Sequence, residues 1–139
     1  MTRVSQRLDY ALRALTAVAA RPPEATVAAG EIADRLGLPR RFVEQQMTAL
    51  AKAGLVTSRR GARGGCALAR PASTITIADV VEALEGTVLD VPAVSDSAVS
   101  EMWASAAAGF REVLAGITLA DLARRQRVID SERAPMYHI

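Results

Sequence analysis

Apolar residues recur every three or four positions in the first third of the chain, which is the spacing of one face of an α-helix. The spacing predicts a helix over residues 5–20, with an inner face of Leu8, Leu12, Leu15 and Ala19. A short helix over residues 28–36 and a third over residues 39–53 follow, separated by Gly37, a residue type that commonly ends helices. The pattern therefore predicts two short helices that meet at a glycine-containing turn.

The period changes from helical to strand-like after residue 54. Residues 55–58 and 66–69 are short β-prone runs, and the seven residues between them include three arginines and three glycines. This pattern predicts an antiparallel hairpin whose loop is longer than the two to five residues of most hairpins. Two helices, a turn and a following hairpin together indicate a winged helix-turn-helix.

The longest apolar face belongs to a helix expected over residues 96–115. A helix over residues 77–84 and a linker over residues 87–95 precede it, and a short helix with Thr118 as its cap follows. From about residue 128 the sequence is polar, and we expect a loose tail. The apolar face of the long helix contains Val99, Met102, Trp103, Ala106, Phe110, Val113, Leu114 and Ile117.

These elements define a fold class that is mainly α with a small β-hairpin. We expect a winged helix-turn-helix domain over residues 1–86. Residues 87–127 then contain the linker, the dimerisation helix and a short last helix, and residues 128–139 form the tail. A small chain has little remaining core to cover the long apolar face, so we expect that face to pair with a second copy in a two-fold symmetric homodimer.

The charge is distributed unevenly along the chain, although the net charge is only +2. Residues 1–70 contain 12 Lys and Arg against 5 Asp and Glu, whereas residues 71–139 contain 5 against 10. A basic half of this kind suits a polyanion. We expect a cytoplasmic protein without a membrane segment, because the N-terminus lacks the apolar part of a signal peptide and no apolar run reaches about 20 residues.

The outer face of the third helix and the hairpin loop carry side chains that suit DNA. The predicted contacts are Arg40, Arg41, Glu44, Gln45 and Thr48 in the helix, and Arg59, Arg60 and Arg63 in the loop. A helix fits the major groove, where arginine pairs with guanine and glutamine with adenine. Arginine also enters narrow minor grooves. An ordinary solvated helix face and a flexible solvated loop are the alternatives that the residues leave open.

Several motifs together resemble the Rrf-two family of bacterial winged-helix transcription regulators, over residues 3–125. They are YALRAL at 10–15, FVEQ at 42–45, LAKAGLV at 50–56, SRRG at 58–61, GGCALA at 64–69, IADVVEALEG at 77–86 and ITLADL at 117–122. The resemblance implies a homodimer whose long helices pack together and place two winged helices on a palindromic site. It also implies that Arg40, Arg41, Glu44 and Gln45 read the major groove and that Arg60 enters the minor groove.

The chain departs from that family where many members hold an iron–sulfur cluster. Those members carry three cysteines between the fourth and the long helix, whereas residues 87–103 contain none. We therefore expect no iron–sulfur cluster and no metal site. Asp9 matches a ligand position of some members, and without thiolates we interpret it as a surface or interface carboxylate. We expect a small effector or a partner protein to act in an apolar pocket bordered by Asp9, Tyr10 and Trp103.

Cys66, the one cysteine of the chain, lies in the second strand of the expected hairpin. Its position fits a small, half-buried apolar residue. The sharper alternative is a redox-active thiol, because neighbouring arginines would lower the pKa of the thiol.

We interpret the chain as a sequence-specific transcriptional regulator, most readily a homodimeric repressor of double-stranded DNA with a pseudo-palindromic site. An enzyme is not indicated, because no nucleophile–base pair, phosphate loop or paired carboxylates stand out. A partner enzyme could replace a small ligand as the source of control. The alternative from another class is a winged-helix module that binds a protein. The hairpin loop lacks aromatic residues, which argues against it, because protein hot spots favour Trp and Tyr.

Overall fold

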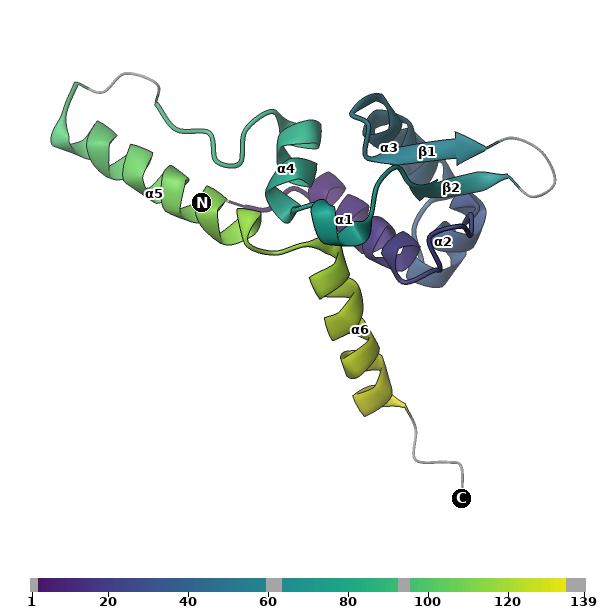
Figure 1. Ribbon diagram of the computed structural model, residues 1–139. Helices are drawn as coiled ribbons and strands as arrows, with labels where there is room; N and C mark the ends of the chain where they lie inside the picture. Colours follow the sequence, from purple (N-terminus) through teal and green to yellow (C-terminus); the bar gives the residue numbers. More distant parts are fainter. Residues whose placement is uncertain (1–2, 60–63, 93–95, 135–139) are drawn as a thin grey trace.

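Three helices and a two-stranded hairpin come first in the computed structural model, and three further α-helices follow (Figure 1). The structure describes residues 3–59, 64–92 and 96–134. The elements are α1 (Gln6–Ala19), α2 (Ala29–Leu36), α3 (Arg40–Lys52), β1 (Val56–Arg59), β2 (Gly65–Leu68), the 3-10 turn η1 (Ala72–Thr74), α4 (Ile77–Glu85), α5 (Ala98–Ala115) and α6 (Leu119–Arg133). The expected class, mainly α with a small β-hairpin in a winged helix-turn-helix, is confirmed.

Helix α1 organises the core, because it contacts α2, α3, α4, α6 and β2. Its Leu15 is fully buried. Four other helices each contribute one large, fully buried side chain: Ile32, Leu50, Val80 and Leu119. Each such burial contributes about 1.5–3 kcal/mol to stability. The expected inner face of α1 is only partly correct: Ala11, Ala14, Leu15 and Val18 are its buried residues. Leu8, Leu12 and Ala19 are partly buried and pack against the edge of the core.

The hairpin is attached to the rest of the domain by a third extended segment. Strands β1 and β2 pair antiparallel, each within one residue of its expected range. Before α2, the amide of Val27 donates to the carbonyl of Cys66, and the amide of Cys66 donates to the carbonyl of Val27, both at 2.8 Å. The base of the hairpin is thus fixed to the segment that leads into the helix-turn-helix.

Two similar stretches of sequence meet where α4 and α6 begin. Residues 75–79 read ITIAD and residues 117–121 read ITLAD, a similarity that our sequence analysis overlooked. In each stretch the threonine caps its helix and the aspartate closes a capping box. The two stretches pair antiparallel, with the amide of Ile77 donating to Ile117 at 2.9 Å and the amide of Leu119 donating to Ile75 at 3.0 Å. The segment that follows α5 is therefore tied directly to the start of α4 in the winged-helix domain.

Helix α6 is longer than expected. It continues to Arg133, so the prediction of a loose tail from residue 128 is wrong for residues 128–133. The capping box stabilises the start of the helix, and Gln126 donates to Asp130 one turn further on, at 2.9 Å. The polar sequence of residues 128–133 therefore continues a helix that its capping box has already started. The rest of the expected tail lies outside the described residues, and the domain boundary after residue 86 stays a prediction.

Candidate nucleic-acid interface

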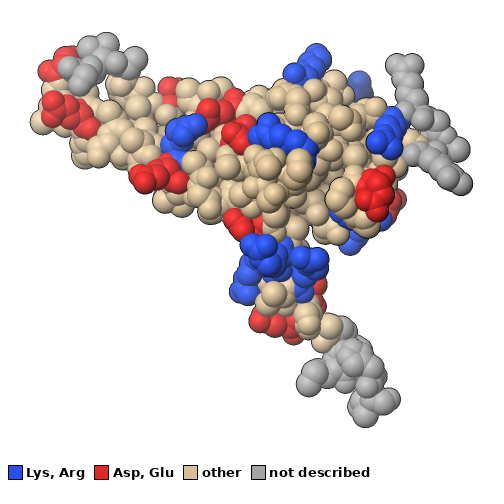
Figure 2. All heavy atoms as spheres, viewed as in Figure 1, with Lys and Arg blue, Asp and Glu red and all other residues tan. Residues whose placement is uncertain are grey.

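Helix α3 separates an apolar inner face from a polar outer face. Val43, Met47 and Leu50 are buried against the core. The five predicted contact residues of this helix are all exposed: Arg40, Arg41, Glu44, Gln45 and Thr48. Basic side chains lie over the part of the molecule that carries α3 and the hairpin (Figure 2). The structure thus brings the predicted helix residues together on one surface.

The five residues differ in how their side chains are engaged. Arg40 Nε lies 3.0 Å from Glu44 Oε1, and the Thr48 hydroxyl donates to the Glu44 carbonyl at 2.9 Å. Both members of the Arg40–Glu44 pair are more than half exposed, so the pair adds little stability and can exchange for a phosphate contact. Arg41 and Gln45, one helical turn apart, have no polar side-chain partner among the described residues. They are therefore the side chains most readily available to a base edge.

The hairpin carries a further exposed arginine, Arg59. Arg59 is exposed at the end of β1 and pairs in register with Gly65 at the start of β2. Gly65 has a φ of +145°, and a Cβ at this position would lie 2.7 Å from the carbonyl carbon and oxygen of Val27. Only glycine therefore permits the close approach of these two segments. Arg60 and Arg63, the other predicted loop contacts, lie outside the described residues.

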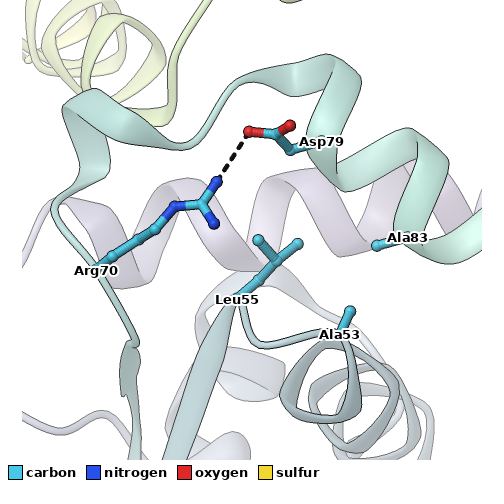
Figure 3. Close-up of a pocket in the computed structure, with 5 residues that line it drawn as sticks. All are labelled: Ala53, Leu55, Arg70, Asp79 and Ala83. Carbon is cyan, nitrogen blue, oxygen red and sulfur yellow. Dashed lines mark hydrogen bonds and ion pairs between the residues drawn. The ribbon is translucent and has the colours of Figure 1, made fainter.

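Arg70 connects the base of the hairpin to α4, a contact that our sequence analysis did not identify. Its Nη2 lies 2.9 Å from Asp79 Oδ2 and also donates to the Thr74 carbonyl at 3.2 Å. The pair borders a hollow of about 270 Å³ between the end of α3, the start of β1 and α4, which Ala53, Leu55 and Ala83 complete (Figure 3). The Asp79 carboxylate thus serves both its helix cap and the hairpin.

Cys66 is buried in β2, opposite Ser58 of β1. Burial raises the pKa of its thiol above the usual value, and a hydrogen bond with Ser58 lowers it by less. The position fits the small apolar residue of the first interpretation.

We expect the Cys66 thiol of the native protein to react with an aromatic disulfide reagent at pH 7 at least about tenfold more slowly than that of the urea-unfolded chain. The reason is that only the thiolate attacks, and both burial and the raised pKa reduce its availability. The native rate should rise as the pH approaches the pKa. Stopped-flow absorbance measures both rates, and equal rates in the native and unfolded protein would contradict this prediction.

Helix α5 presents an unusual apolar surface. None of its residues is buried, and Val99, Met102, Trp103, Phe110 and Val113 are between 44% and 62% exposed. The predicted interface residue Ala106 is exposed as well, whereas Leu114 is half-buried and packs against the core of its own chain.

In the described part of the chain, no helix is long and apolar enough to span a bilayer.

Two of the three residues of the predicted effector pocket, Asp9 and Tyr10, contact other side chains of the chain. Arg13 Nε pairs with Asp9 at 2.9 Å, and Gln6 donates to the Tyr10 hydroxyl at 2.7 Å. The Tyr10 ring packs edge-on against Phe42 of α3, with ring centroids 5.7 Å apart. Neither the hollow beside Arg70 nor a second one of about 280 Å³ beside Pro22 and Pro71 includes these residues. The effector pocket stays a prediction.

Known proteins resemble this chain in sequence and in fold. The family Rrf2, described as "Iron-dependent Transcriptional regulator", matches residues 4–125. The HTH-type transcriptional regulator CymR of Bacillus subtilis is 33% identical over 123 residues, which cover 87% of this chain and 89% of CymR. The solved structure of CymR, the global cysteine regulator of B. subtilis, aligns with a TM-score of 0.81 at 33% identity and covers 90% of this chain and 98% of that one. The solved structure of IscR from T. potens aligns with a TM-score of 0.77 at 36% identity and covers 99% and 94%.

Proposed function

This chain belongs to the Rrf2 family of transcriptional regulators, and from that premise we propose that it is a homodimeric repressor that binds a pseudo-palindromic DNA site without an iron–sulfur cluster. The observation that carries the proposal is the joint exposure of two surfaces. One is the polar outer face of α3 beside the hairpin, and the other is the apolar face of α5. The first surface suits DNA and the second suits another copy of the chain.

Each copy places α3 in a major groove. Arg41 and Gln45 face base edges, where arginine pairs with guanine and glutamine with adenine. The Arg40 side chain leaves Glu44 and binds a phosphate. The carboxylate of Glu44 then repels the bases and phosphates that it would meet at a wrong site. Arg59, Arg60 and Arg63 bring positive charge to the neighbouring backbone and minor groove.

A two-fold symmetric dimer binds two inverted copies of the same half-site, so the whole DNA site is palindromic. Pairing through the α5 faces holds two copies of α3 at a fixed separation, so two half-sites one helical turn or a multiple apart are read together. The Thr76–Thr118 bridge supports this geometry, because it ties the segment that follows α5 to the start of α4 within the same chain. A signal that alters the α5 pairing, from a small ligand or a partner enzyme, would change this separation and hence the affinity for DNA.

The residues present do not fit the iron–sulfur cluster that some family members hold. Clusters are held mainly by cysteine thiolates, typically four. This chain has one cysteine and one histidine, and Cys66 is buried in the hairpin rather than beside α5. Among the described residues, no group of three or more metal-binding side chains comes together. Anaerobic purification followed by iron and sulfide analysis tests this part, and stoichiometric iron with acid-labile sulfide would contradict it.

Selection of bound duplexes from a random pool, repeated at several salt concentrations, tests the DNA proposal. We expect a pseudo-palindrome, with an affinity that falls steeply with salt because each neutralised phosphate releases counterions. Arg41→Ala should cost about 1–3 kcal/mol of specific binding and relax the sequence preference at one position per half-site. Arg133→Ala, a change at the far end of α6, is the matched control and should leave binding unchanged.

Failure to select any sequence, or affinity that does not depend on salt, would contradict the DNA proposal. Equal losses from Arg41→Ala and Arg133→Ala would contradict the role of α3 in base recognition. The same selection with Arg60→Ala measures the contribution of the loop.

A further inference from the structure

Helix α4 is joined by ion pairs to three other parts of the chain. Its three paired carboxylates are spaced three residues apart and so form one stripe along the helix. The pairs, with their N–O distances, are Asp79 with Arg70 after the hairpin (2.9 Å), Glu82 with Arg111 of α5 (2.6 Å) and Glu85 with Arg7 of α1 (3.0 Å). The hairpin and the helix that carries the apolar stripe are therefore both linked to the same short helix.

Helix α5 has few attachments to its own chain. None of its residues is buried, and it extends away from the domain (Figure 1). Near its base, Leu114 packs against the core, and Arg111 Nε donates to Glu82 Oε1. Within the described residues, this is the only polar side-chain contact between α5 and another helix or strand. The direction of α5 therefore depends on the packing of its last turns and on this one ion pair.

A small change in the direction of α5 has a large effect at its far end. The helix has 18 residues, so it is about 27 Å long at about 1.5 Å per residue. A change of about 10° at its base would move the far end by about 5 Å relative to the winged helix of the same chain. This displacement exceeds the rise of one base pair, about 3.4 Å. In a dimer paired through α5, such a change would alter the separation of the two α3 helices, which sets the distance between half-sites.

The Glu82–Arg111 pair can set this direction without being needed for folding. The side chain of Arg111 is 55% exposed and that of Glu82 is 37% exposed. Exposed pairs contribute little to the free energy of unfolding, and the core that holds the domain together lies elsewhere. Loss of the pair should therefore leave a folded domain whose α5 helix can take other directions.

We propose that Glu82 and Arg111 are positioning residues that fix the direction of α5 and thereby the spacer length between the two half-sites that the dimer accepts. The proposal rests on the proposed homodimer and adds a determinant of site architecture to it. In that dimer, Arg41 and Gln45 choose the bases within a half-site, whereas the Glu82–Arg111 pair chooses the distance between half-sites without touching DNA.

Selection from a pool of inverted half-sites, joined by spacers of about 0 to 12 base pairs, tests the proposal. Glu82→Arg places two cations together at the base of α5 and leaves α5 itself unchanged. We expect this variant to select the same half-site sequence, while its preference for the original spacer over neighbouring lengths falls at least about threefold. Glu82→Gln, which removes the charge without repulsion, should show a smaller change in the same direction. Adding Arg111→Glu to Glu82→Arg restores opposite charges and should restore the original spacer preference.

Glu85→Gln is the matched control, because it removes a similar ion pair of the same helix that leads to α1 rather than to α5. It should keep the original spacer preference. Circular dichroism and sedimentation equilibrium verify that each variant is folded and dimeric. An unchanged spacer preference in both Glu82 variants, an equal change in Glu85→Gln, or no recovery in the exchanged pair would overturn this proposal while leaving the homodimer intact. Selection of single half-sites alone by the unchanged protein would overturn the proposed binding to a palindrome itself.

Discussion

Trp103→Asp is expected to convert the protein into monomers and to abolish high-affinity binding to a palindromic site. Trp103 lies within the exposed apolar stripe of α5 and is 44% exposed in the single chain. A buried tryptophan in an interface is commonly worth about 2 kcal/mol or more. Because two-fold symmetry places the substitution twice in the dimer, the loss is about 4 kcal/mol, roughly a 1000-fold increase in the dissociation constant. The introduced carboxylate would add an unpaired charge in an apolar contact.

Light scattering and a mobility-shift titration on the selected site measure the two effects. Ala108→Asp is the matched control, because it introduces the same charge in the same helix on the side opposite the stripe, where Ala108 is exposed. It should lower helix stability by no more than about 0.7 kcal/mol and leave the dimer intact. Identical behaviour of the two variants, or a Trp103→Asp dimer of unchanged affinity, would contradict the assignment of this face.

Gly65→Ala is expected to destabilise the protein by about 2–4 kcal/mol, which combines overpacking with backbone strain. The added Cβ would lie 2.7 Å from the carbonyl group of Val27, and the φ of +145° is one that alanine rarely adopts. Relief requires the two segments to separate, and this would break the pair of 2.8 Å hydrogen bonds between Val27 and Cys66. The hairpin would then lose its fixed position beside α3, and specific DNA binding should weaken as well.

Urea unfolding followed by circular dichroism measures the loss of stability. Gly116→Ala provides the control, because its φ is −88° and the nearest atoms to an added Cβ lie at ordinary contact distances of 3.5 and 3.7 Å. Its effect should stay within about 1 kcal/mol. Equal midpoints for Gly65→Ala and the unchanged protein would show that the hairpin base tolerates a side chain, contrary to the close approach described here.

The candidate DNA-contacting residues on α3 could be predicted because they depend on one helix alone. Once residues 40–52 are helical and Val43, Met47 and Leu50 face inward, the geometry of 3.6 residues per turn places Arg41, Gln45 and Thr48 outward. Arg70 could not be found in this way. Arg70 follows the hairpin in sequence and pairs with Asp79 of α4. The sequence indicates that α4 begins near Asp79, but nothing in it indicates that Asp79 also binds Arg70.

By itself the sequence determined the local elements: the helices, their glycine and threonine ends, the hairpin, and the apolar stripe of α5. These follow from contacts between residues at most a few positions apart, for which backbone geometry permits few solutions. Only the tertiary structure decided which distant segments meet. It paired Val27 with Cys66 and Thr76 with Thr118, and it placed Tyr10 against Phe42. Such contacts depend on how the helices pack around α1, and many pairings of short segments satisfy the same local pattern until that packing selects one.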